Sequence, residues 1–198
     1  MDYTQETLYF EIEAYLQHIN FAFNCYEAYD ALCDIGKTDY DFVNTSPGFF
    51  TITRYALSKC LLIEIAKLFC GSGDERTIHK LIKIAKSNNS LFINNRAKQL
   101  CEDANNVFAN DFANTISKIK ARRDKDLSHN DPLFFHGNIN PSEVNYISPD
   151  EIQEILSYSF NFCVELLECL SHREKVILTH GADDLRNLVE KIHGLNLN

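Results

Sequence analysis

Apolar residues recur at steps of three and four along most of this chain, and this period limits its fold more than any other feature. The clearest case covers about residues 4–32, where neither glycine nor proline interrupts the series Leu8, Ile12, Tyr15, Leu16, Ile19, Phe23 and Tyr26. Such steps place the residues on one side of an α-helix, whereas a strand requires alternation. The whole sequence holds only 7 Gly and 4 Pro, too few for the many turns of an all-β protein. We therefore predict an all-α protein.

Four long segments and two short ones carry this period. The long helices are expected at about 4–33, 49–69, 94 or 95–123 and 148–170, and the short ones at 77–86 and 183–193. The third long helix is predicted to bury Leu100, Val107, Phe112, Ile116 and Ile119, and to bend near 105–106 or 109–111. Residues 34–48 and 130–147 are rich in Gly, Pro, Asn or Ser and are predicted to form loops.

Two helices carry more specific signals. Ser148, Pro149 and Glu151 form the pattern of an N-cap, a first-turn proline and a capping box, so a helix should begin there. The helix at 49–69 contains the run from Cys60 to Ile63, which is apolar on nearly all sides, and we expect this helix to lie centrally. Together these segments predict an up-and-down bundle of four main helices with shorter additions.

The chain reads as a single domain over residues 1–198. Its length of 198 residues is ordinary for one domain, and the sequence has no internal repeat and no linker that would divide it. On this reading the long N-terminal helix at about 4–33 and the short helix at about 183–193 are elaborations of one helical domain.

The seven cysteines form an odd set without any CxxC pair, and several lie among apolar residues. Buried free thiols explain this pattern better than disulfides or zinc, and they suit a reducing cytoplasm. No run approaches the roughly 20 apolar residues that span a bilayer, and the N-terminus lacks the features of a signal peptide. We expect a soluble cytoplasmic protein that does not bind membranes.

A basic run interrupts an otherwise acidic sequence with a net charge of −9. Five cationic side chains fall within eight residues: Lys118, Lys120, Arg122, Arg123 and Lys125. His129 follows six positions after Arg123. A solvated helix face is the plain explanation of such a run. The alternative is a site, because arginine binds phosphate oxygens as a planar fork and histidine titrates near neutrality.

The geometry of Arg123 and His129 depends on where the helix ends. In a continuous helix, six residues would turn them about 240° apart and raise them about 9 Å. Pro132 and the turn-forming residues before it favour an end between the two, so that the chain curls back. If the helix continues instead, Arg122 and His129 lie seven apart on one face.

Either arrangement suits the cleavage of a phosphodiester without a metal or another cofactor. His129 would take the proton from a ribose 2′-hydroxyl or donate one to the leaving 5′-oxygen, and Arg123 would stabilise charge on the phosphoryl oxygens. Asp124 would orient either group, and the product would be a 2′,3′-cyclic phosphate. Lys118, Lys120, Arg122 and Lys125 would bind the RNA backbone. His136 is a weaker candidate for the same site, and His18 and His79 are expected inside amphipathic helices, partly buried or on the rim.

At these residues the sequence resembles the HEPN superfamily (higher eukaryotes and prokaryotes nucleotide-binding domains). Its motif is an arginine, a polar residue and a histidine after four to six intervening positions; here five separate Arg123 from His129. The segment 123–131 and the helix at 54–69 are similar to the subfamily associated with abortive phage infection. The resemblance implies an all-α bundle, frequent homodimers with facing motifs, and metal-independent ribonuclease activity in many members.

Two functions therefore stand beside each other. The first is a HEPN-type endoribonuclease, a toxin or phage-defence effector, acting on RNA as a homodimer under the restraint of an antitoxin or another protein. The second is a non-catalytic helical module that binds RNA, a nucleotide or a partner protein through its basic run. Whether Arg122 or Arg123 fills the arginine role stays open at this point.

Overall fold

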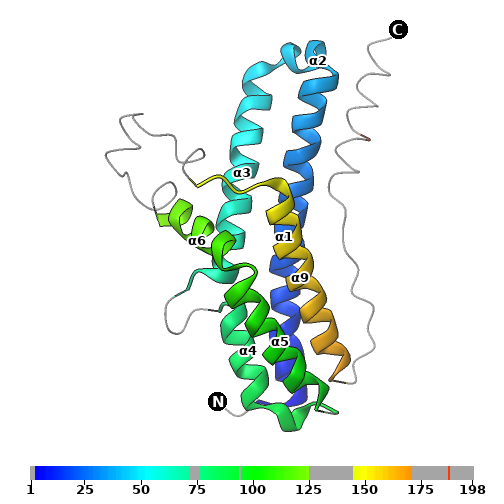
Figure 1. Ribbon diagram of the computed structural model, residues 1–198. Helices are drawn as coiled ribbons and strands as arrows, with labels where there is room; N and C mark the ends of the chain where they lie inside the picture. Colours follow the sequence, from blue (N-terminus) through cyan, green and yellow to red (C-terminus); the bar gives the residue numbers. More distant parts are fainter. Residues whose placement is uncertain (1–2, 72–75, 94, 125–144, 171–186, 188–198) are drawn as a thin grey trace. The chain divides into compact units, whose positions relative to one another are not determined.

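The computed structural model describes residues 3–71, 76–93, 95–124, 145–170 and 187, and within these ranges the regular structure is entirely helical (Figure 1). Its elements are α1 (Gln5–Thr38), α2 (Tyr40–Thr45), α3 (Pro47–Phe69), α4 (Ile78–Ser87), a 3₁₀ turn (Asn89–Leu91), α5 (Arg96–Asn110), α6 (Ala113–Arg122) and α9 (Pro149–Glu168). The all-α prediction is confirmed. The up-and-down arrangement of four main helices stays a prediction, and the helix expected at 183–193 lies outside the described residues apart from Asn187.

The predicted loop at 34–48 was wrong. Helix α1 continues through Gly36 to Thr38, and α2 fills most of the remaining segment. The side chain of Asp39 caps α2 by accepting a hydrogen bond of 3.0 Å from the backbone N–H of Phe42. Phe42 is buried with Leu32 and Phe50, so tertiary burial holds a helix where local composition indicated a loop.

Two predictions about the long helices are confirmed, namely the break in one and the start of another. The stretch expected from 94 or 95 to 123 is broken between Asn110 and Ala113, the second of the two predicted places. The N–H groups of Asp111 and Phe112 both donate to the carbonyl of Val107, which ends α5. Helix α9 begins with the predicted capping box, in which Ser148 and Glu151 each accept a hydrogen bond from the other's backbone N–H.

The chain divides into two compact units, Met1–Ile19 with Leu62–Val176 and Asn20–Leu61 with Ile177–Asn198. In the first unit α5 packs against α4, α6 and α9. Its core includes Leu8, Ile12, Leu81, Phe108, Ile155 and Leu166, all fully buried. In the second unit a smaller cluster forms around Leu32, Phe42 and Phe50. The prediction of a single domain stays a prediction.

Helix α3 is less enclosed than its sequence indicated. Ile52, Tyr55 and Ile63 are 69%, 64% and 41% exposed, whereas Leu61, Leu62 and Ile65 are buried. One side of α3 thus presents apolar residues to solvent, and its central place in the bundle stays a prediction.

The seven cysteines are all free, and five of them are buried, which confirms the expectation of unpaired thiols. Burial raises the pKa of the Cys101 thiol to about 12, so this residue is a neutral part of the core. None of the helices in the described ranges combines the length and the apolar character needed to cross a membrane.

Candidate functional site

Arg123 stands at the end of α6, as the sequence predicted. Thr115 and Ile119 are the buried residues of this helix, one turn apart. The N–H of Arg123 donates to the carbonyls of Ile119 and Lys120 and closes the helix, and Arg123 and Asp124 continue the backbone as a π-helical turn. The α-helix α6 therefore ends at Arg122.

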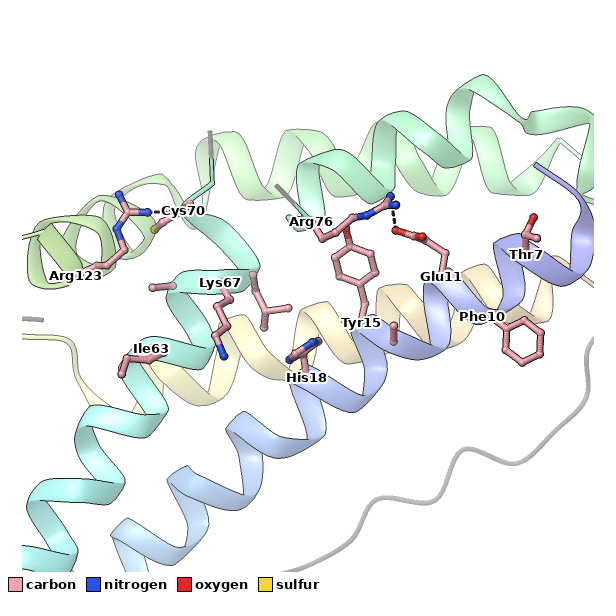
Figure 2. Close-up of a pocket in the computed structure, with 13 residues that line it drawn as sticks. Thr7, Phe10, Glu11, Tyr15, His18, Ile63, Lys67, Cys70, Arg76 and Arg123 are labelled. Carbon is pink, nitrogen blue, oxygen red and sulfur yellow. Dashed lines mark hydrogen bonds and ion pairs between the residues drawn. The ribbon is translucent and has the colours of Figure 1, made fainter. Parts of the chain in front are cut away.

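The guanidinium of Arg123 is held by two neighbours. Its Nε donates to Oδ1 of Asp124 over 2.8 Å, and its Nη2 lies 2.7 Å from the same oxygen. Its Nη1 donates to the backbone carbonyl of Cys70, the residue after the last turn of α3 (Figure 2). Carbonyls at a helix C-terminus lack an intrahelical partner, so a cation there satisfies one of them and is itself fixed. The side chain keeps 31% of its surface exposed.

The thiol of Cys70 is not a reactive group in this arrangement. Burial raises its pKa, and the nearby charge of Arg123 opposes this effect only in part. A thiol with a raised pKa is protonated near neutral pH and is a poor nucleophile. Of the two side chains, Arg123 and not Cys70 is therefore the candidate for a chemical role.

Arg123 borders a pocket of about 910 Å³ within the first unit. We call it the α1–α3 pocket, because its walls come mainly from residues 7–18 of α1 and 63–68 of α3 (Figure 2). Its principal side chains are Phe10, His18, Ile63, Lys67, Arg76 and Arg123.

Two charged clusters line this pocket. Glu64, whose side chain is only 9% exposed, has one carboxylate oxygen 2.6 Å from Lys67 Nζ and the other 3.3 Å from His18 Nδ1. Glu11 lies 2.7 Å from a guanidinium nitrogen of Arg76. Arg76 also donates to the hydroxyl of Tyr3 over 3.3 Å. These contacts fix the cations on the pocket wall.

The contacts of Tyr15 and His79 indicate that both side chains support the fold. The hydroxyl of Tyr15 donates to the carbonyl of Thr77 over 3.0 Å, and burial raises the pKa of that hydroxyl. The ring of His79 meets Phe108 edge-on, and burial lowers the pKa of this histidine, so it is neutral at pH 7. His79 is thus a packing residue, as the sequence suggested.

The other members of the basic run have different surroundings. Lys118 is held by Glu151, with Nζ 2.7 Å from Oε1, whereas Lys120 is exposed and Arg122 is half-buried. Lys125, His129 and His136 lie outside the described residues. The sequence thus found Arg123 and its contact with Asp124 but missed the pairing of His18 with Glu64.

The comparison with protein families agrees with the resemblance drawn from the motif. The family model HEPN_AbiU2, described as AbiU2, matches residues 8–188. The chain belongs to this HEPN family. The matched range extends from α1 beyond the end of α9 and covers positions 123–129. No curated protein and no solved structure matches the chain.

A metal site in this HEPN domain would need a group of three or more His, Cys, Asp or Glu side chains. Within the part of the chain that the structure describes, no such group is gathered closely enough to hold a metal ion. Glu11 and Glu64 each pair with a cation that lines the pocket.

Glu151 links the basic run to α9, and its replacement should make stability depend on pH. Hydrogen bonds from Lys118 and from the backbone of Ser148 lower the pKa of its carboxyl. A carboxyl with a lowered pKa stabilises the fold above its ordinary pKa, and this contribution disappears as the pH falls. We expect Glu151→Gln to destabilise this HEPN protein by about 1 kcal/mol at pH 7. The difference from wild type should vanish well below a pH of about 4.3.

Urea unfolding between pH 3 and pH 7 measures this effect. Glu154→Gln is the matched control, because Glu154 is exposed on the same helix and should change little at any pH. An equal loss in both variants, or a loss for Glu151→Gln that persists at pH 3, would contradict the assignment.

Proposed function

We propose that this protein is a metal-independent endoribonuclease of the HEPN type. The observation that carries the proposal is Arg123, an arginine held by Asp124 and by the Cys70 carbonyl on the wall of an open pocket, six positions before His129. Membership of the AbiU2 family supports it, because the resemblance to the HEPN superfamily implies ribonuclease activity in many members.

The contacts of Arg123 leave it able to bind a phosphate. A guanidinium carries five N–H donors. In the described part of the chain, Asp124 and the Cys70 carbonyl face three of its nitrogens, each through one donor. Two N–H groups then remain for phosphoryl oxygens. A donor set fixed before the substrate arrives stabilises developing charge without reorganisation.

The proposed reaction is a transesterification. The 2′-hydroxyl loses its proton to an imidazole, its oxygen bonds to phosphorus, and the bond from phosphorus to the 5′-oxygen breaks. The 5′-oxygen takes up a proton, and the products are a 2′,3′-cyclic phosphate and a 5′-hydroxyl. His129 performs one of the two proton transfers. In a homodimer with facing motifs, the second copy's His129 would perform the other.

The proposal extends to the setting of the reaction. We infer a role in phage defence, with cellular or phage RNA as substrate and an antitoxin or other protein as restraint. Lys120, Arg122 and Lys125 are the proposed contacts to the RNA backbone. Lys118 serves mainly the ion pair with Glu151.

Incubation of purified protein with single-stranded RNA in excess EDTA tests the proposal. We expect cleavage products ending in 2′,3′-cyclic phosphate, and no cleavage by a His129→Ala protein that unfolds at the wild-type temperature. Cleavage that requires Mg²⁺, or that survives in His129→Ala, contradicts the mechanism. RNA binding without cleavage in wild type would favour the non-catalytic module instead.

A further inference from the structure

Cations gather on the wall of the α1–α3 pocket, although the chain carries 28 Asp and Glu against 19 Lys and Arg. The pocket lining contains Lys67, Arg76 and Arg123 together with His18, and its acidic residue is Glu11. Each of the three cations is paired with a carboxylate, so the charges balance in number. An anionic ligand is favoured where the cation of such a pair is the more exposed partner.

The carboxylates that pair with Lys67 and Arg76 are less exposed than these two cations. The side chains of Lys67 and Arg76 are 55% and 56% exposed, whereas those of Glu64 and Glu11 are 9% and 16% exposed. An approaching anion therefore meets the cation before the carboxylate. The carboxylates act as fixed supports, and they reduce the side-chain entropy that binding would otherwise cost.

Apolar side chains share the same walls. Phe10 and Ile63 are 55% and 41% exposed, although both are large and hydrophobic, and both line the pocket. In Figure 2 Arg123 lies at one end of the labelled residues, Phe10 and Thr7 lie at the other, and Lys67 and His18 lie between them. Fixed cations combined with a ring open to stacking are the features by which proteins hold unpaired nucleotides.

We propose that the α1–α3 pocket holds a short stretch of single-stranded RNA next to the bond that is cleaved at Arg123. Its phosphates lie at Lys67 with His18 and at Arg76, and a base stacks on Phe10. This inference rests on the proposed function, since it takes Arg123 as the point of cleavage. The occupant is single-stranded because the bases of a duplex are already stacked and offer no free face to Phe10.

Equilibrium binding of a fluorescent oligoribonucleotide to a His129→Ala protein tests the pocket without cleavage. Phe10→Ala should weaken binding about tenfold. Lys67→Met should weaken binding and flatten the slope of log K against log salt by about 0.7, the value for one phosphate contact on a single strand.

Matched controls lie outside the pocket. Phe21 is 49% exposed on the same helix as Phe10, and Lys86 is a lysine that forms a longer ion pair, of 3.9 Å, with Glu102. Phe21→Ala and Lys86→Met should bind RNA as the parent protein does. Equal losses in these controls would mean that binding is diffuse, which overturns the proposal.

The pair of Arg76 and Glu11 separates RNA contact from a structural role. Arg76→Met removes the cation, whereas Glu11→Gln removes its neutralising partner and keeps the cation. If Arg76 contacts RNA, the first change weakens binding and the second leaves it unchanged or tightens it. If the ion pair only supports the fold, both variants lose stability and binding together, and Arg76 is not an RNA contact.

The outcomes also separate this inference from the proposed function. If wild type does not cleave RNA but the pocket variants lose RNA binding, the nuclease proposal fails and the assignment of the pocket as an RNA-binding site is supported. If wild type cleaves RNA and Phe10→Ala and Lys67→Met bind and cleave normally, the pocket assignment is overturned alone. A change of oligomeric state in these variants with unaltered RNA binding would make the pocket a contact between copies, which also overturns it.

Discussion

Replacing Phe108 with alanine should lower the free energy of unfolding by about 3–5 kcal/mol, the range for deleting a buried aromatic ring. Phe108 is 1% exposed. Its ring centroid lies 5.6 Å from Phe69, 5.3 Å from Tyr158 and 6.0 Å from Phe112, with His79 at 6.1 Å. The ring therefore joins α3, α4, α5 and α9 within one unit, and these helices cannot all close on the cavity it would leave.

Chemical denaturation and thermal melting measure this loss. For a protein of this size about 1 kcal/mol corresponds to about 2–4 °C, so the melting temperature should fall by roughly 6–20 °C. Phe10→Ala is the control, since Phe10 is 55% exposed and its removal should cost less than about 1 kcal/mol. A loss of about 1 kcal/mol or less at Phe108 would mean that the core is not organised around this ring.

The sequence predicted the existence of α5 correctly but not the side that it buries. Large apolar residues suggested a face through Leu100 and Val107, which are only half-buried. The buried face consists of Ala97, Cys101, Ala104 and Phe108. Alanine and cysteine carry a weak hydrophobic signal, but they allow helices to approach closely. The periodicity of large side chains alone therefore gave the helix and missed its orientation.

Local patterns also explain which ends of helices could be predicted. The start of α9 could be predicted from residues close together in the sequence, because Ser148 and Glu151 form a capping box, and the structure contains this capping box. The segment at 34–48 is helical because Phe42 is buried with Leu32 and Phe50. No pattern within the segment itself indicates this burial. Burial between distant residues overrides turn propensity there.

In the candidate site, too, local features could be predicted from the sequence and contacts between distant segments could not. The motif with Arg123 and Asp124 lies within one stretch of sequence, so residue types and spacing were enough to find it. The α1–α3 pocket depends on contacts between distant segments, such as His18 with Glu64, which are 46 positions apart. Arg123 and the carbonyl of Cys70 are 53 apart. One sequence carries no information on such pairs until the helices are packed.

Arg123→Lys should lower the rate of RNA cleavage about 10²–10³-fold, the usual effect of removing one preorganised donor to a developing oxyanion. A lysine keeps the positive charge but places it on a single nitrogen. It cannot contact Asp124 and the Cys70 carbonyl through separate nitrogens and still present two donors to a phosphate. The variant should remain folded, because Arg123 keeps 31% of its surface exposed and no core residue changes.

Single-turnover cleavage in EDTA, beside melting temperatures, measures this effect, and two variants sharpen it. Arg96→Lys changes an arginine with a 2.9 Å ion pair to Glu165, away from the pocket, and should cleave normally. Arg122→Lys should also retain cleavage, since a lysine keeps the positive charge that the proposed contact of Arg122 with the RNA backbone requires. A large loss at Arg122 with activity preserved at Arg123 would transfer the arginine role to Arg122. If Arg122→Lys and Arg123→Lys both keep their activity, a positive charge alone is sufficient, and the mechanism does not depend on the planar shape of a guanidinium.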